Sequence, residues 1–266
     1  MQLASRTFVV TGGGNGIGRE VVLELLRREA RVAAVDLSAD GLAETARLAG
    51  AGDRLSTHVV NVADRAAVEA LPDAVLAAHG QVDGLLNVAG IIHPFQRIGE
   101  LPIETLERVM QVNFWGVVHT VTAFLPLLKA RPAAALLNVS SMGALAPVPG
   151  QSAYGASKAA VKLLTEGMQA ELQGSSVAVT VVFPGGVGTN ITGNSGVSIE
   201  RSVESSGAAA SLTTAADAGS QIVDAVAAGA PRLVIGKDAR ALDRLARLVP
   251  TRVGGIIAKR MAGLLR

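Results

Sequence analysis

The chain has 266 residues, of which 49% are hydrophobic, 17% are charged and only 3% are aromatic. This composition provides for a sizeable core of small aliphatic side chains and argues against intrinsic disorder. Because the chain contains no cysteine, disulfide bonds and thiolate metal sites are excluded. The sequence shows no signal-peptide pattern and no apolar run long enough to span a membrane, so we expect a cytoplasmic location.

The net charge of +2 is distributed unevenly along the chain. Residues 231–266 hold nine basic and two acidic side chains, so this segment carries +7 while residues 1–230 carry −5. We expect residues 238–266 to form a basic helical extension with one apolar stripe, made of Leu242, Leu245, Leu248 and Val249. Such a segment is either a solvated amphipathic helix or a surface for anionic lipid or acidic ligands, and the sequence leaves both open.

Short apolar runs bounded by turn-forming residues alternate with longer segments of helical periodicity. The apolar runs predict seven strands, at Thr7–Val10, Arg31–Val35, Leu55–Val60, Gly84–Val88, Ala134–Val139, Val177–Phe183 and Arg232–Ile235. The periodicity predicts helices that include Gly18–Arg28, Arg65–His79, Ile103–Lys129 and Tyr154–Gln173. Together they predict one α/β domain over residues 1–266, with a doubly wound, seven-stranded, mostly parallel sheet and helices on both faces.

Residues 190–213 interrupt this alternation. The segment is rich in Gly, Ser and Asn and has no clear period. A stretch of this length inside a compact domain is usually a binding loop or a lid, so we expect it to cover a substrate.

The first predicted strand runs directly into a glycine-rich segment, residues 11–18 (TGGGNGIG), which a helix follows. Glycines at such a turn permit positive φ angles, a close approach of the backbone to a pyrophosphate, and close packing of helix on strand. The helix N-terminus then offers unpaired N–H groups and the positive end of its dipole to the phosphates. The segment therefore predicts a dinucleotide site in a Rossmann-type fold.

Asp36 ends the second predicted strand, 18 residues after Gly18. A carboxylate at this point can accept hydrogen bonds from the adenosine ribose hydroxyls and would repel a 2′-phosphate. No Arg or Lys lies inside the glycine segment or directly after Asp36, which favours NAD over NADP. A role as a helix cap or turn residue is the alternative.

Tyr154 and Lys158 begin another predicted helix. Their i, i+4 spacing places them on one helix face, within reach of a shared ligand. A phenol titrates near pH 10, and a neighbouring ammonium stabilises the phenolate, which lowers the pKa toward the range of a general acid/base. Tyr154 is also the only tyrosine of the chain.

These elements resemble the motifs of the classical short-chain dehydrogenases/reductases. The glycine segment matches the TGxxxGxG loop of that family, and residues 154–158 match its YxxxK element. Ser141 and Asn113 stand where the family has its catalytic serine and asparagine. Residues 87–90 (NVAG) are similar to its NNAG element, and residues 184–189 (PGGVGT) are similar to its PGxVxT element. The resemblance extends from about residue 5 to 190 and includes the strand near Val234.

The resemblance implies a mechanism for a secondary alcohol and its ketone. Tyr154 exchanges a proton with the substrate oxygen, and Ser141 holds and polarises that oxygen. Lys158 lowers the pKa of Tyr154 and binds the nicotinamide ribose, while Asn113 supports a water that connects Lys158 to solvent. A bound nicotinamide carries the hydride. Ser141 as a simple strand end, and Asn113 as a buried helix residue, are the alternatives.

The resemblance also implies the residues that contact the cofactor. They are Gly12, Asn15, Gly16, Ile17, Gly18, Asp36, Leu37, Asn61, Val62, Asn87, Ala89, Gly90, Tyr154, Lys158, Pro184, Gly185, Val187 and Thr189. Two positions depart from the family pattern. Val88 replaces an asparagine, which removes a structural hydrogen bond, and Asn61 replaces an aspartate at the adenine-binding turn, although its backbone carbonyl can still accept a bond from the adenine amino group.

We therefore expect an NAD-dependent oxidoreductase of a small-molecule alcohol or ketone that forms homodimers or homotetramers and binds no nucleic acid. A catalytically silent NAD-binding regulatory or scaffold module is one alternative, and a lipid- or steroid-acting variant attached to a membrane surface by its basic extension is another. The four histidines lack metal-ligand spacing, so we expect no metal. His93 lies in a loop that should face the substrate, as an ordinary loop residue or as a ligand contact.

Overall fold

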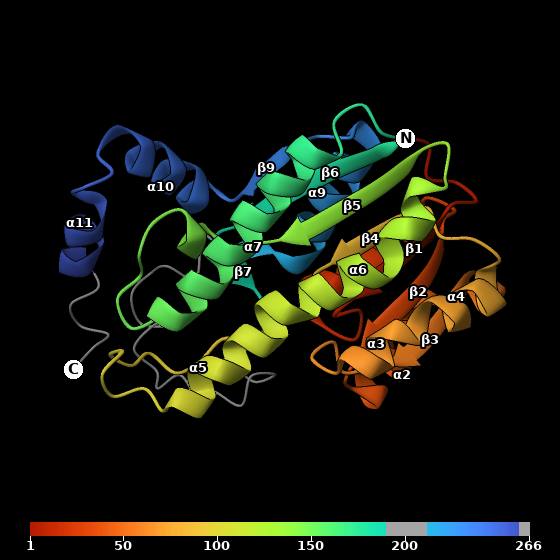
Figure 1. Cartoon of the computed structure of the whole chain (residues 1–266), viewed down its shortest axis with the longest axis horizontal. Coiled ribbons are helices and arrows are strands. Elements are labelled where there is room, and N and C mark those ends of the chain that lie inside the picture. The colour runs from red at the N-terminus through yellow and green to blue at the C-terminus, as the bar shows by residue number, and fades with distance from the viewer. Residues whose placement is uncertain (190–211, 261–266) are drawn as a thin grey trace.

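The computed structural model describes residues 1–189 and 212–260 (Figure 1). The predicted 190–213 loop therefore lies outside the described residues, apart from its last two positions. The centre of the molecule is a seven-stranded sheet with the order β3-β2-β1-β4-β5-β6-β9. Its strands are β1 (Thr7–Thr11), β2 (Arg31–Asp36), β3 (Leu55–Val59), β4 (Gly84–Asn87), β5 (Ala134–Val139), β6 (Val177–Pro184) and β9 (Arg232–Ile235).

All six neighbouring pairs in this sheet are parallel. The seven predicted strands and the doubly wound arrangement are thus confirmed, with ends that differ by one residue at most. A second sheet pairs β7 (Val187–Gly188) with β8 (Thr213–Thr214), and the sequence pattern did not predict it. Because parallel strands end at the same edge, the loops that follow the strands gather on one side of the main sheet.

Ten helices surround the sheet in the described part of the chain. They are α1 (Gly16–Arg27), α2 (Ala39–Ala49), α3 (Arg65–Glu69), α4 (Leu71–His79), α5 (Ile103–Met110), α6 (Gly116–Lys129), α7 (Ser152–Glu171), α9 (Ala215–Ala228), α10 (Lys237–Leu248) and α11 (Val253–Arg260). Three short turns join them: η1 (Gly52–Arg54), the π-helical η2 (Gln111–Trp115) and η3 (Met142–Ala144).

Side chains alternate between the two faces of the strands and build two cores. On β1, Val10 packs in the core that includes Val22 of α1 and Ile222 of α9. The neighbouring Val9 points into the opposite core, with Phe124 of α6 and Val161 of α7. Both faces of the sheet are covered, which explains why its central strands are mostly apolar rather than alternating with polar residues, whereas the edge strand β3 (LSTHV) has no buried residue.

Two predicted helices differ from the observed ones. The segment Arg65–His79 is divided into α3 and α4, because Pro72, in the first turn of α4, has no N–H to continue the hydrogen bonds of α3. The segment Ile103–Lys129 contains the π-helical turn η2 between α5 and α6. Among the described residues, no helix is long and apolar enough to cross a bilayer.

Candidate active site

The glycine segment after β1 is shaped by close approaches of backbone to backbone. Gly12 has a φ of +74°, and a Cβ added there would lie 2.9 Å from the Cα atom of Ala89. A Cβ at Gly18 would lie 2.0 Å from the carbonyl oxygen of Gly12. Both positions exclude any side chain, so α1 begins directly against the end of β1.

The N-terminus of α1 opens into a hollow. The Asn15 side chain accepts a hydrogen bond from the N–H of Gly16 at 2.7 Å, and the first turn of α1 contains no acidic residue. The hollow measures about 430 Å³ and is lined by Asn15, Gly16, Arg19, Glu20, Gly188, Thr189 and Ala215. The structure thus brings the glycine segment and the PGxVxT-like segment to one cavity, as a phosphate-binding helix terminus requires.

Asp36 connects the glycine segment to the end of β2. Its Oδ2 accepts the N–H of Gly14 at 2.9 Å, and its Oδ1 accepts the N–H of Ser38 at 2.9 Å. The predicted ribose ligand therefore also stabilises the loop beside it, so both roles foreseen for Asp36 are compatible with the geometry. The next side chain, Leu37, is 69% exposed and offers an apolar surface at the same edge.

Arg19 is a cation next to the glycine segment that the sequence reasoning missed. Its Nε donates to Thr45 Oγ1 at 3.0 Å, and its Nη2 donates to the carbonyl oxygens of Gly14 and Gly41. The guanidinium therefore supports the glycine segment from outside. The sequence signal for this residue is its position directly after Gly18, one residue beyond the glycine segment.

The segment from Pro184 to Thr189 is fixed by the helix that follows the last strand. The N–H of Gly185 donates to the carbonyl oxygen of Ile235 at 2.9 Å, and the N–H of Gly186 donates to Asp238 Oδ2 at 2.7 Å. Val187 pairs with Thr213 in the two-stranded sheet. Asp238, at the start of α10, thereby holds the segment whose last two residues line the hollow at the N-terminus of α1.

The predicted adenine-side and β4-side residues have structural contacts of their own. Asn61 caps the turn after β3, where its side chain accepts the N–H of Ala63 at 3.0 Å, while Val62 is buried. The Asn87 amide donates to Asn138 Oδ1 at 2.9 Å inside the sheet. The N–H group of Ala89 is held by Thr11 Oγ1 at 3.2 Å, so the β4 loop is anchored to the glycine segment.

Tyr154 lies in the first turn of α7 and faces the turn after β5. A point beside the Cα of Gly143 is 3.6 Å from Ser141 Oγ and 3.7 Å from Tyr154 Cε1, which places both side chains at one spot. Burial raises the pKa of Tyr154, and a hydrogen bond with the Ser141 side chain acts in the opposite direction. The expected lowering of this pKa by Lys158 is therefore wrong for the protein alone, because desolvation of the phenolate dominates.

Lys158, one helical turn further, is buried to 3% exposure. Its ammonium donates to the carbonyl oxygen of Val139 at 3.0 Å, at the end of β5. Burial lowers the pKa of Lys158 to about 8, because water no longer stabilises the charge. A Cβ added at Gly90 would lie 3.0 Å from Lys158 Nζ, so a side chain at this position would crowd the ammonium.

Asn113 occupies the centre of the π-helical turn η2 and is fully buried. Its Oδ1 accepts the N–H of Ile91 at 2.8 Å, and its Nδ2 donates to the carbonyl oxygen of Ile91 and to Ser157 Oγ, both at 3.0 Å. A side chain at Gly90 would lie 3.2 Å from Asn113 Oδ1. The structure therefore brings Asn113 and Lys158 together around Gly90, while Ser141 and Tyr154 meet one helical turn earlier on the same face of α7.

His93 is a second residue whose contact the sequence did not reveal. It is buried to 1% exposure, and its Nδ1 lies 2.7 Å from the carbonyl oxygen of Pro94. Because a carbonyl oxygen only accepts, Nδ1 is the donor, and Nε2 is left as an acceptor for the N–H of Tyr154 at 3.4 Å. The amide of Gln151 donates to the carbonyl oxygen of His93 at 2.7 Å. His93 therefore connects the β4 loop to the first turn of α7.

Comparisons with known proteins agree with this geometry. The family model described as short chain dehydrogenase matches residues 6–198. The chain belongs to the short-chain dehydrogenase family of oxidoreductases.

Its relatives include enzymes named for hydroxyl-bearing substrates. The Mycobacterium tuberculosis protein named as the oxidoreductase SadH is 38% identical over 97% of this chain and 95% of its own length. The 1-deoxy-11-beta-hydroxypentalenate dehydrogenase of Streptomyces avermitilis is 34% identical over 77% of this chain and 80% of its own. A solved short-chain dehydrogenase/reductase from Burkholderia phymatum, in complex with NAD, superimposes with a TM-score of 0.85 at 26% identity and covers 94% of this chain and 95% of that one.

The contact between His93 and Tyr154 predicts a positioning effect. His93→Leu removes the acceptor, whereas His93→Gln keeps one at nearly the same place. We expect the leucine variant to lose about ten- to a hundredfold in kcat, since small displacements of a reacting group are costly, and the glutamine variant to recover much of it. Cofactor affinity should stay unchanged in both. Steady-state kinetics with a pH profile of kcat tests this, and equal losses in the two variants, or losses that follow Tm, would contradict it.

Burial of the Lys158 ammonium predicts a cost in stability. The pKa of Lys158 is about 8 in the folded protein and 10.5 as the ordinary value. Below pH 8 the buried charge therefore destabilises the folded state fully, and this destabilisation disappears as the pH rises toward 10.5. Lys158→Met should therefore raise the free energy of unfolding at about pH 7 by about 1–3 kcal/mol, reduced somewhat by the lost bond to Val139. The gain should shrink near pH 10.

Urea denaturation of the cofactor-free protein measures this change. Lys162→Met, on the same helix, is the matched control, because Lys162 is partly exposed and pairs with Glu166 at 2.7 Å. We expect it to change stability by less than about 1 kcal/mol. A Lys158→Met protein less stable than the parent at neutral pH would show that the ammonium is not a burden to the fold.

Proposed function

We propose that this protein is an NAD-dependent oxidoreductase that interconverts a secondary alcohol and a ketone, with Tyr154 as the general acid/base. The observation that carries the proposal is the contact between the Tyr154 and Ser141 side chains at the first turn of α7. The buried Lys158 ammonium follows one helical turn later. Two relatives of this chain are named as dehydrogenases of hydroxyl-bearing molecules, the second being the 2-(R)-hydroxypropyl-CoM dehydrogenase of Xanthobacter autotrophicus.

The described residues fit a dinucleotide. Side chains are excluded at Gly12 and Gly18, the N-terminus of α1 faces a hollow of about 430 Å³, and Asp36 stands at the end of β2. In the proposal, Gly16, Ile17 and Asn15 hold the phosphates, Asp36 and Leu37 the adenosine, and Asn61 and Val62 the adenine edge. Asn87, Ala89, Gly90, Pro184, Gly185, Val187 and Thr189 then surround the nicotinamide end. When bound there, a nicotinamide supplies the hydride chemistry.

Each catalytic side chain has a separate task in this proposal. Ser141 Oγ donates a hydrogen bond to the substrate oxygen and fixes its place. Tyr154 Oη takes the hydroxyl proton of an alcohol, or returns a proton to the oxygen of a ketone. Lys158 places a positive charge near the developing phenolate and can bind the nicotinamide ribose. Asn113 holds the β4 loop in place beside Lys158 and supports a water for proton relay.

Burial of the Tyr154 phenol predicts how the rates of the two reaction directions depend on pH. Since burial raises the pKa of Tyr154, the phenol holds its proton at neutral pH, the form that ketone reduction requires. Alcohol oxidation requires the deprotonated form and should accelerate as the pH rises. The positive charge of a bound oxidised nicotinamide would favour the phenolate, so the working pKa of Tyr154 for alcohol oxidation lies below that of the protein alone.

A catalytically silent cofactor-binding module is the alternative function. It would bind NADH without turning over any alcohol. The four proposed catalytic side chains, Asn113, Ser141, Tyr154 and Lys158, are all present, which favours the enzyme. A coupled NADH screen over secondary alcohols, steroids, sugars and acyl thioesters separates the two functions and identifies the substrate class.

Replacement of the phenol is the direct test of the mechanism. Tyr154→Phe keeps the ring and removes only the hydroxyl, so turnover should fall at least about a hundredfold, the scale of general acid/base catalysis. NADH binding, followed by fluorescence titration, should persist. Near-normal turnover in this variant would refute Tyr154 as the acid/base, and lost NADH binding would mean that the substitution had disturbed the cofactor site instead.

Replacement of the β2 carboxylate tests the cofactor assignment. Asp36→Ala removes the negative charge that would repel a 2′-phosphate, so the ratio of kcat/KM for NAD to that for NADP should fall at least about tenfold. Asp40→Ala, a nearby charge on the first turn of α2, is the control and should leave the ratio unchanged. An unaltered ratio in Asp36→Ala, or a parent enzyme that prefers NADP, contradicts the assignment.

A further inference from the structure

The solvent-facing side of α10 is a cationic surface that the proposed function does not use. With 3.6 residues per turn, six exposed side chains fall within roughly a third of the helix circumference. They are Lys237, Arg240, Ala241, Arg244, Arg247 and Leu248. We call this set the cationic face. The predicted apolar stripe is corrected here: Leu242, Leu245 and Val249 are half-buried against the protein, but Leu248 is 79% exposed on the cationic face.

The two acidic residues of α10 do not lie on this face. Asp243 is half-buried and pairs with Arg232 at 2.8 Å and with Arg247 at 3.1 Å. Asp238 is exposed as well, but it lies about 100° around the helix from Lys237 and accepts the N–H of Gly186. Among the residues that the structure describes, Lys237 and Arg244 make no ion pair.

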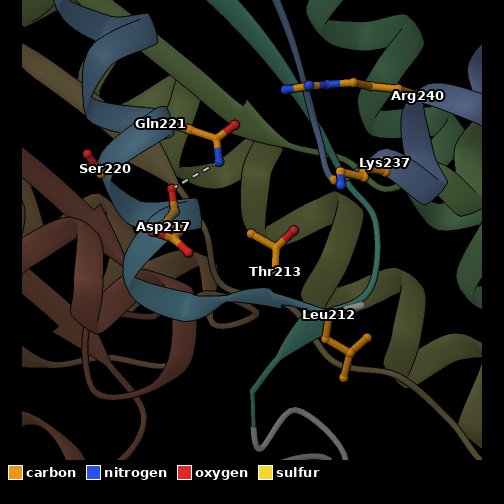
Figure 2. A pocket seen from close by; sticks show the side chains of 8 residues that line it. Leu212, Thr213, Asp217, Ser220, Gln221, Lys237 and Arg240 are labelled. Atoms are coloured by element: carbon orange, nitrogen blue, oxygen red, sulfur yellow. Dashed lines mark hydrogen bonds between the residues drawn. The ribbon is translucent and has the colours of Figure 1, made fainter. Parts of the chain in front are cut away.

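The cationic face lies at one end of the molecule, beyond β9, and α11 continues from it (Figure 1). Figure 2 shows Lys237 and Arg240 on the α10 side of a hollow of about 530 Å³, opposite Asp217 and Gln221 of α9. The α11 segment also reaches the loop that leads from Ser141 to α7, because a Cβ added at Gly254 would lie 3.1 Å from Pro147 Cγ. The segment that continues from the cationic face therefore borders the loop between Ser141 and α7.

We propose that the cationic face binds the surface of an anionic lipid bilayer. Four clustered basic side chains on one helix face are the pattern that attracts acidic phospholipids. Arg247 is already paired with Asp243, and each of the other three contributes about a fivefold gain in binding. A bilayer also accounts for Leu248, because an exposed leucine among cations can enter the headgroup boundary. A nucleic acid would offer Leu248 no apolar partner, and the face carries no aromatic side chain for stacking on bases.

Vesicle co-sedimentation of the full-length protein tests the proposal. The vesicles are phosphatidylcholine alone, and phosphatidylcholine with about one-third phosphatidylserine. We expect the protein to pellet with the anionic vesicles only, and to be released when the ionic strength rises from about 0.1 M to about 0.5 M. Equal pelleting on neutral vesicles, or none on anionic ones, overturns the proposal.

Charge-matched variants locate the surface. Lys237→Gln combined with Arg244→Gln removes two charges, each of which contributes about fivefold, so binding should weaken about twenty-five-fold. Arg65→Gln combined with Lys129→Gln removes the same charge from exposed positions elsewhere and should bind as the parent does. Leu248→Gln should weaken binding without changing the salt dependence. Circular dichroism and Tm confirm that each variant is folded.

Two further outcomes decide against a membrane. If both double variants lose binding equally, the overall charge and not the cationic face is responsible. If a DNA duplex competes the protein off the vesicles at equal charge concentration and Leu248→Gln binds as the parent does, the face is a general polyanion site. None of these measurements uses turnover, so the outcome is separate from that of the proposed enzymatic activity.

Discussion

The side-chain amide of Asn113 is the contact on which the rest of the site depends. It satisfies both backbone groups of Ile91 and the hydroxyl of Ser157, and so joins three segments that are distant in the sequence: the β4 loop, the turn between α5 and α6, and α7. A regular α-helix would rotate this side chain away from the loop, and the wider π turn places it inward. Gly90 is then held where a Cβ would make tight contacts with both Asn113 and Lys158, so the glycine gives the ammonium more space.

The electrostatics of the site follow from burial more than from pairing. Two groups that must exchange charge with a reaction stand one helical turn apart in a poorly hydrated region, and each is pushed toward its neutral form: the pKa of Tyr154 is raised and that of Lys158 is lowered to about 8. A single carbonyl oxygen, that of Val139, receives the ammonium. In the protein alone, the buried ammonium of Lys158 is therefore unfavourable, and only charges that arrive with ligands can compensate it. Active sites commonly reduce stability in this way.

The sequence predicts those parts of the molecule that local rules determine. Seven strands, the glycine segment and the Tyr154–Lys158 pair follow from periodicity, backbone clearance and helical spacing, and the structure has them where they were expected. The contact from His93 to Tyr154 spans 61 positions, so only the tertiary fold reveals it. The π turn at Asn113 was not foreseen either, because one extra residue in a helical turn hardly alters the apolar pattern. The prediction that Leu248 belongs to the apolar stripe of α10 was wrong, because this leucine lies at the margin of the stripe and its side chain faces solvent.

Tyr154 and Trp115 are the only residues of their kinds in the chain, and this gives the protein optical labels of its own. The ultraviolet band of tyrosinate arises from one phenol, so absorbance during an alkaline titration follows the proton of the site itself and of no other group. Trp115 is 44% exposed and lies two residues from Asn113 in the π turn, edge-on to Phe114. Its emission therefore reports on the turn. A native, unmodified sample thus separates proton release from movement of the backbone that holds the site, in a single cuvette.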